Sequence, residues 1–198
     1  MDHKIIEIIA LGAFVYYPSI PIVLMLIHGF IGQWRKIGTK SYYLFLLFFG
    51  VLDLTALLFV LKYKESLLAW RLYNNPWALL GLVLLIASTI SGFVSIRALS
   101  FKTLMALPEI SPDKKSSRLV NQGIYKHIRH PRYLEFVLEV LGLAIASGLG
   151  ANFILLLYFV PMIYWASLFE EKELIERLGQ EYIDYQKTTG RFWPKVRG

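Results

Sequence analysis

The sequence predicts an all-α polytopic membrane protein with about five transmembrane helices, and it excludes a soluble globular domain. Hydrophobic residues fill 56% of the 198 positions, and the mean hydropathy is +0.51. Charged residues make up only 18% of the chain, whereas soluble domains carry about 25%. The apolar residues lie in runs of about 20, the length at which a helix crosses a bilayer core about 30 Å thick. The short alternating segments of a membrane β-barrel are absent from the sequence.

The first three apolar runs predict three membrane-spanning helices. The first covers about residues 5–31 and contains Pro18 and Pro21. Because proline removes a helical hydrogen bond and crowds the preceding turn, we expect a kink or a break there. The second and third runs cover about residues 42–61 and 77–96, and neither contains a proline.

The fourth and fifth spans are expected over about residues 133–149 and 152–169, the latter with Pro161 inside it. Pro131 suits the start of the fourth helix, because the N–H groups of a helix's first turn have no partner within the helix and proline, which lacks this group, loses no hydrogen bond there. The connection between the two spans is very short, so they should be antiparallel neighbours. The residues before the fourth helix and those after the fifth should therefore meet at one membrane surface.

A polar tail follows the fifth span and shows helical periodicity. Charged residues separate its apolar positions, so we expect an amphipathic helix with a possible break at Gly179. Such a helix can lie on the membrane surface or cover a site, and the sequence leaves both alternatives open. The apolar positions of the tail are Leu174, Leu178, Tyr182 and Tyr185.

The distribution of basic residues predicts the orientation of the chain. With the N-terminus outside and the C-terminus in the cytoplasm, 17 of the 21 Lys and Arg residues lie on the cytoplasmic side. The net charge of +7 is thus a signal of topology and of anionic lipid contact rather than of nucleic acid binding. Asp2 and Glu7 stand where a signal peptide would be basic, so no cleavable signal is expected. The absence of cysteine excludes disulfides, thiolate metal sites and cysteine nucleophiles.

The predicted helix hairpin brings a site-like group of side chains to its cytoplasmic mouth. Residues 125–133 read Tyr-Lys-His-Ile-Arg-His-Pro-Arg-Tyr, and the far end of the hairpin carries Glu170 and Glu171. Donors from one segment therefore face a pair of carboxylates from the other. The two histidines in this stretch, His127 and His130, have no third ligand nearby in the sequence, so no metal site is predicted.

Several short motifs in the last 80 or so residues resemble one superfamily of integral membrane methyltransferases. It comprises the isoprenylcysteine carboxyl methyltransferases and the phospholipid methyltransferases. The resemblance implies a cofactor, S-adenosyl-L-methionine, and a lipophilic small-molecule or lipidated acceptor that enters from the bilayer. The motifs are Leu119-Val120, Gly123-Ile124-Tyr125, Arg129-His130-Pro131-x-Tyr133, Glu170-Glu171 and Gly179-x-Glu181-Tyr182-x-x-Tyr185.

The resemblance also implies roles for individual residues and a division of the chain. Arg129 and Glu170 are the expected catalytic residues, placed to orient the acceptor. One membrane domain, 1–198, would contain three variable helices in 1–96, with the cofactor-binding loop, the hairpin and the tail in 97–198. The expected cofactor-binding residues are Ser117, Arg118, Leu119, Val120, Tyr125, His130, Pro131, Arg132, Tyr133 and Glu171.

The sequence departs from the isoprenylcysteine pattern in three places. Residues 165–169 hold no base ahead of the acidic pair, Ser117 stands where a histidine is frequent, and Glu135 stands where a glycine is frequent. These departures argue against a prenylcysteine carboxylate as acceptor. The missing base is closer to the phospholipid methyltransferase branch.

Three acidic residues lie inside the expected spans, where a charge costs about 3 kcal/mol or more unless it has a partner. Glu135 can pair with Arg132. Glu139 can line the substrate cavity, and Asp53 can line it too or accept interhelical hydrogen bonds. The donors considered for Asp53 are Ser88, Thr89 and Ser91.

Two alternative functions share this composition. A membrane reductase of the sterol type would use NADPH, although the sequence has no glycine-rich phosphate-binding motif. A small non-enzymatic, transporter-like protein would use the acidic residues within the spans as a proton relay. The sequence predicts no nucleic acid partner and leaves the oligomeric state open.

Overall fold

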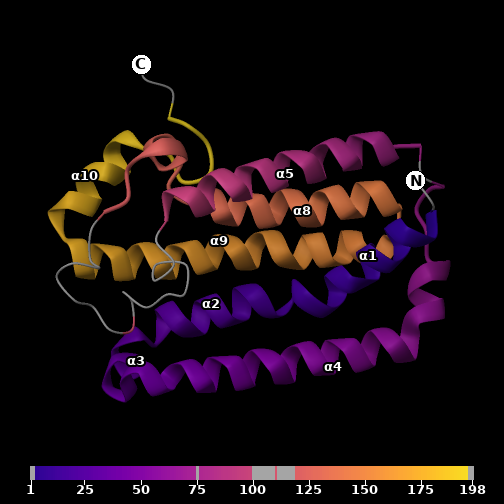
Figure 1. Cartoon of the computed structure of the whole chain (residues 1–198), viewed down its shortest axis with the longest axis horizontal. Helices are drawn as coiled ribbons and strands as arrows, with labels where there is room; N and C mark the ends of the chain where they lie inside the picture. The colour runs from indigo at the N-terminus through magenta and orange to yellow at the C-terminus, as the bar shows by residue number, and fades with distance from the viewer. Residues whose placement is uncertain (1–2, 75, 100–109, 111–118, 196–198) are drawn as a thin grey trace.

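The computed structural model describes residues 3–74, 76–99, 110 and 119–195. Long helices run side by side along one direction and form the body of the molecule (Figure 1). Within the described residues, β-structure is limited to two isolated bridges, Arg71 with Leu149 and Ile128 with Gly190. The predicted all-α membrane fold is confirmed.

The first predicted span is two helices, α1 (His3–Tyr16) and α2 (Ser19–Gly29). The break falls at Pro18, as the sequence predicted, because its ring is incompatible with an uninterrupted helix. Tyr158 of α9 donates a hydrogen bond of 2.9 Å to the carbonyl of Pro18, so a side chain from another helix satisfies this acceptor at the interruption. Pro21 lies in the first turn of α2, where proline is tolerated.

A tight turn connects the first span to the second. It consists of α3 (Ile31–Ile37) and the 3₁₀-helix η1 (Gly38–Lys40). The second span, α4 (Ser41–Ala69), is eight residues longer at its end than the apolar run predicted. The third span, α5 (Ala78–Ala98), agrees with its prediction.

The predicted hairpin consists of α8 (Pro131–Ser147) and α9 (Gly150–Leu178). Gly148 ends α8 in the left-handed conformation with φ 67°, a conformation that favours glycine at a helix C-terminus. Among the described residues, four helical stretches are long and apolar enough to cross a membrane: Lys4–Gly29, Ile31–Ala69, Ala78–Ala98 and Gly150–Leu178. With 17 residues, α8 is at the short end of the spanning range, and counted with these four it gives the five predicted spans.

The predicted tail helix begins as a continuation of α9. That helix ends at Leu178, Gly179 interrupts it with φ 62°, and α10 (Gln180–Thr188) follows. Tyr182 and Tyr185 of α10 are buried, as the apolar periodicity suggested. At the end of α9, however, the buried side chains are Glu171 and Glu173, whereas Leu174 and Leu178 are only half-buried. The inward face of this segment is therefore anionic.

The helices pack through small residues on one side of α8 and through larger apolar residues on the other. Gly81 of α5 lies against Ala146 of α8, a close approach that a larger side chain would prevent. The main buried cluster joins α1, α2, α8 and α9. Its members are Ala13, Tyr17, Ile20, Tyr133, Val140, Leu143, Leu155, Phe159 and Ile163.

Asp53 of α4 is bound differently from the expectation. It accepts a hydrogen bond of 2.7 Å from Ser19 at the start of α2. The suggested donors on α5 are not its partners, because Ser88 and Thr89 donate to the Leu85 carbonyl of their own helix. The break at Pro18 makes Ser19 the first residue of α2, and from this position its hydroxyl reaches Asp53.

Candidate functional site

A cavity of about 610 Å³ lies where the segment before α8 meets the first two spans and α9. Both halves of the chain form its walls: α1, α2 and α4 on one side, and residues 125–133, α8 and α9 on the other. Its polar lining comes mainly from the second half. The lining residues are Tyr16, Ile20, Val23, Leu24, Ile27, His28, Leu46, Phe49, Leu99, Tyr125, Arg129, His130, Pro131, Arg132, Tyr133, Phe136 and Glu170.

Most of the predicted site residues lie at this cavity. Arg129 and Glu170, the expected catalytic residues, both line it. Glu171 is not a lining residue but contacts two residues that are. Leu119 and Val120 are half-buried and do not line the cavity, and the prediction for residues 117–118 lies outside the described residues. The expected cofactor-binding residues that line the cavity are Tyr125, His130, Pro131, Arg132 and Tyr133.

The C-terminal tail holds the segment before α8 in place. The short 3₁₀-helix η2 (Gly123–Lys126) starts this segment. The backbone N–H of Arg129 then donates to the Gly190 carbonyl at 2.8 Å, and that of His130 donates to the Arg191 carbonyl at 3.0 Å. Tyr185 of α10 donates a hydrogen bond to the carbonyl of Tyr125. Because these bonds fix the backbone, the side chains of Arg129 and His130 have defined positions.

Glu171 is the most heavily bonded carboxylate at the site, and its side chain is only 5% exposed. Arg129 contacts its Oε1 through Nη2 at 2.8 Å, and His130 Nε2 lies 2.9 Å from the same oxygen. Arg191 donates to Oε2 at 2.6 Å, and Gln186 donates to it at 3.0 Å. A carboxylate offers about four acceptor positions, and these four residues fill the positions of Glu171. Sequence reasoning placed Arg129 opposite Glu170, whereas the structure pairs it with Glu171.

Glu170 is less fully satisfied than its neighbour. Its Oε2 lies 3.3 Å from His130 Nδ1, yet within the described residues this buried oxygen accepts no hydrogen bond of good geometry. Burial on its own would lower the pKa of the His130 imidazole, but the charges and hydrogen bonds of Glu170 and Glu171 together raise it. The ring of His130 stacks on Tyr133 with centroids 5.2 Å apart. The cavity therefore contains a carboxylate oxygen with unused capacity beside a histidine that favours its charged form.

Two of the acidic residues within the spans have partners close to this cavity. Arg132, a lining residue, donates to Glu135 Oε2 at 2.6 Å, which confirms the predicted pair. Glu135 rests against Gly92 of α5, where a side chain would overlap its carboxylate. Glu139 accepts a hydrogen bond of 2.6 Å from Tyr17 and does not line the cavity.

Sequence reasoning missed His28, Gln186 and Arg191. His28 lies at the end of α2, is 7% exposed and lines the cavity. Its presence in an apolar span was a usable signal, because ionisable residues within spans mark functional sites by default. Gln186 and Arg191 gave no such signal, because they stand in a polar tail where the pattern does not distinguish them.

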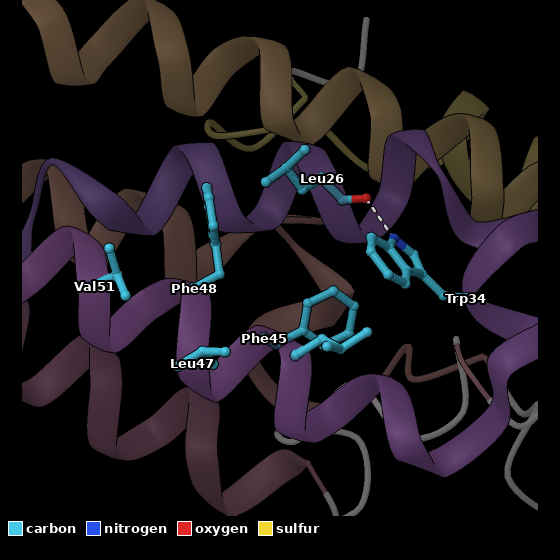
Figure 2. Close-up of a pocket in the computed structure, with 7 residues that line it drawn as sticks. Leu26, Trp34, Phe45, Leu47, Phe48 and Val51 are labelled. Atoms are coloured by element: carbon cyan, nitrogen blue, oxygen red, sulfur yellow. Dashed lines mark hydrogen bonds between the residues drawn. The ribbon is translucent and has the colours of Figure 1, made fainter.

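A second, wholly apolar pocket of about 410 Å³ lies between α2, α3 and α4. Figure 2 shows Phe45 and Phe48 of α4 below Leu26 of α2, with Trp34 at one side donating a hydrogen bond of 2.8 Å to the Leu26 carbonyl. A smaller pocket of about 120 Å³ shares Phe45 with this pocket and shares Val23, Ile27, Leu46 and Phe49 with the larger cavity. A series of apolar recesses thus runs along α2 and α4 beside the polar site.

Metal-based chemistry has no evident set of ligands here. Among residues 3–74, 76–99, 110 and 119–195, no group of three or more His, Asp or Glu side chains is arranged to hold a metal ion. His127 lines a different pocket, together with Ser91 and Gly123, so the two histidines of the sequence motif do not face the same cavity.

Comparisons with known proteins identify methyltransferases as relatives of this chain. A family model described as phospholipid methyltransferase matches residues 76–181. A methanethiol S-methyltransferase of Pseudomonas sp. (strain GM41(2012)) is 29% identical over 150 residues. The aligned region covers 71% of this chain and 55% of that relative, so the chain spans about half of the relative's length.

Proposed function

The chain belongs to the phospholipid methyltransferase family, and from this premise we propose that it is an S-adenosyl-L-methionine-dependent membrane methyltransferase. The acceptor we infer is lipophilic or amphipathic. The observation that carries the proposal is the meeting of Arg129, His130 and Glu170 at one cavity that also opens onto apolar walls of α2 and α4. The first half of the chain thus supplies mainly apolar walls to this cavity, and the second half supplies most of its charged groups.

The cavity fits a cofactor of this kind. Its volume of about 610 Å³ falls in the range of about 300–1,000 Å³ found for ligand pockets. The negative charge of Glu170 at the cavity wall favours the sulfonium cation electrostatically, without a hydrogen bond to it. Arg132, which bonds Glu135 through Nη1, adds a positive charge that suits a carboxylate. The rings of Tyr125 and Tyr133 offer flat apolar surfaces. Glu171 supports these residues from behind, through its bonds to Arg129 and His130.

S-adenosyl-L-methionine, when bound, supplies a methyl group already activated by its sulfonium charge. The protein then has to bring the acceptor into line and exclude water, and positioning of this kind can contribute several kcal/mol. Glu170 is placed to orient a donor or cationic group of the acceptor. Arg129 is held by Glu171 and by the carbonyls of Gln186 and Thr189, so it keeps one wall of the cavity fixed.

The surroundings support an acceptor that arrives through the bilayer. The apolar pocket of Figure 2 and the smaller pocket next to it lie along α2 and α4, and α4 has many exposed apolar side chains. Hydrocarbon can occupy such recesses without losing hydrogen bonds. The names of the family and of the relative point to two kinds of acceptor, a phospholipid and a thiol. We place the reaction on the cytoplasmic side, in accordance with the distribution of basic residues.

Cofactor binding in detergent tests the proposal. Purified protein should be stabilised against heat by S-adenosylhomocysteine or S-adenosylmethionine, because a ligand that binds only the folded state raises its stability. Radiolabelled methyl groups should then pass to methanethiol or to phosphatidylethanolamine in vesicles. The variant Glu170→Gln should bind the cofactor and transfer methyl groups more slowly. Stabilisation by NADPH and by neither methionine derivative would favour the reductase alternative instead.

A further inference from the structure

We propose that His28 contacts the methyl acceptor and receives the proton that the acceptor loses. The inference rests on the proposed function and adds a residue to it. His28 lies one residue before the end of α2 and is 7% exposed. It lines the same cavity as Arg129 and Glu170, which come from the other half of the chain.

The hydrogen-bonding state of His28 singles it out. Its Nδ1 is buried and has no hydrogen-bond partner in the part of the chain that the structure describes. Buried polar atoms almost always have a partner, so an exception calls for an explanation. His130, the other histidine at the cavity, has Nε2 at 2.9 Å from Glu171 and Nδ1 at 3.3 Å from Glu170. Of these two histidines, His28 is the one whose ring nitrogen is buried without a hydrogen-bond partner among the described residues.

A second unsatisfied atom belongs to the same cavity. Glu170 Oε2, on α9, is also buried without a hydrogen bond among the described residues. The two atoms come from helices that are far apart in the sequence, and both residues line one space. A ligand with a polar head group can satisfy both of them, whereas a wholly apolar ligand would leave both unpaired. The head group of the acceptor is therefore assigned to the space that His28 and Glu170 share.

The chemistry of methyl transfer needs a proton acceptor when the acceptor is a thiol. The thiol S–H bond breaks, and its sulfur forms a bond to the methyl carbon. The bond from that carbon to the sulfonium sulfur breaks, and its electron pair stays on the cofactor as a thioether. One proton remains, and His28 Nδ1 takes it. A primary amine also loses its proton in this way, whereas a tertiary amine carries no proton to lose and would not require His28.

The charged and titratable groups that act on His28 come from two elements. Glu170, Glu173 and Arg177 belong to α9, and His130 belongs to the segment before α8. Glu173 is held by Arg35 at 2.6 Å and by Arg177 at 2.8 Å. Glu173 is therefore committed to ion pairs, which leaves His28 and Glu170 as the groups with capacity for a ligand.

The position of His28 in the sequence bears on specificity. It lies outside residues 76–181, the region that the family model matches. The cofactor residues predicted by resemblance and found at the cavity all lie inside that region. The wall formed by α2 thus belongs to the part of the chain that the family model does not cover. We expect this wall to distinguish one acceptor from another.

The test compares His28→Gln with His127→Gln in the full chain, purified in detergent. His127 is an exposed histidine at another pocket and is the matched control. Both variants should bind S-adenosylhomocysteine like the wild type. With methanethiol or phosphatidylethanolamine vesicles, whichever the wild type methylates, His28→Gln should be slower by about 100-fold or more. The wild-type rate should rise with pH as His28 loses its proton. This rise should be absent from His28→Gln and present in His127→Gln.

A second measurement does not depend on turnover. The chain has four histidines, so ¹⁵N-histidine labelling gives few ring signals, and the signal lost in His28→Gln identifies His28. In wild-type protein saturated with S-adenosylhomocysteine, methanethiol or the phospholipid should shift this signal and leave that of His127 unchanged. An unmoved His28 signal, or full turnover in His28→Gln, would overturn the inference. Absence of cofactor binding and of methyl transfer in the wild type would instead overturn the proposed function.

Discussion

Arg129 and Glu171 are 42 residues apart in the sequence and form a buried ion pair, with Nη2 2.8 Å from Oε1. Their side chains are 8% and 5% exposed. Arg191 binds the same carboxylate from the tail, so one acidic side chain joins the segment before α8, the end of α9 and the C-terminal segment. The shape of the cavity wall depends on this junction, which places Arg129 and His130.

Loss of the Glu171 charge should destabilise the protein. Glu171→Gln leaves Arg129 and Arg191 without their carboxylate, and removal of one partner from a buried ion pair costs about 3–5 kcal/mol. We expect a clear fall in the thermal unfolding midpoint in detergent. Glu176→Gln, at an exposed position of the same helix, is the control and should unfold like the wild type. Equal midpoints for the two variants would contradict the role assigned to Glu171.

The tail should detach when Gly190 is given a side chain. A Cβ at this position would overlap the carbonyl oxygen of Trp193, so the turn has to open. The backbone bonds from Arg129 and His130 to the tail should then weaken, at a cost of about 1–3 kcal/mol for two hydrogen bonds. Limited proteolysis should cut Gly190→Ala at Arg191 sooner than the wild type. Gly12→Ala, where no atom lies within 4 Å of the added carbon, should be cut at the wild-type rate.

Gly92 should tolerate no side chain, because α5 approaches α8 at Glu135. In Gly92→Ala the added methyl group overlaps the Glu135 carboxylate, which has to move away from Arg132. Overpacking of this kind costs about 1–3 kcal/mol. We expect weaker binding of S-adenosylhomocysteine together with lower thermal stability. Gly50→Ala in α4, with open space around the added carbon, is the matched substitution and should change neither quantity.

Stability should depend on pH through His130. The pKa of His130 is raised in the folded protein above its ordinary value of 6.5, so the folded state binds this proton more tightly than the unfolded state. The resulting stabilisation is complete below pH 6.5 and is lost as the pH rises through the raised pKa. The unfolding midpoint should therefore fall with rising pH in this window. His130→Gln should remove that part of the slope, and an unchanged slope would rule out His130 as its source.

The two ends of the chain should lie on opposite sides of the membrane. A reporter fused after Gly198 should signal from the cytoplasm, and one fused before Met1 should signal from the outside. Both reporters on one side would remove the assignment of α8 as a spanning helix. The reverse result, with the C-terminus outside, would place the cavity on the wrong side for a cytoplasmic cofactor.

The helices could be predicted because the bilayer imposes one simple requirement on the sequence, a long apolar run. Pro18 then marked a break, and the short connection between the fourth and fifth runs marked a turn. The last turns of α4 escaped prediction, since Lys62 and Glu65 end the apolar run while the helix continues to Ala69. Charged residues indicate where a helix leaves the hydrocarbon core of the membrane. The helix itself can continue beyond that point, because its backbone hydrogen bonds do not depend on the bilayer.

The site was predictable only where short-range geometry determined it. The tight α8–α9 connection was enough to bring His130 to Glu170 and Glu171. The partner of Arg129 could not be chosen between adjacent glutamates, because they point in different directions from the helix and packing decides between them. His28 gave a signal as an ionisable residue within an apolar span, but only the packing of α2 against α9 decides that this residue is turned to the cavity.

The junction at Glu171 also has a consequence for evolution. Its donors come from three separate stretches of chain, and a change in one of them leaves a buried charge with an incomplete set of partners. Positions 129, 171 and 191 should therefore be inherited as a set. Across related sequences, a neutral residue at position 171 should occur together with neutral residues at 129 and 191, and single exceptions should be rare.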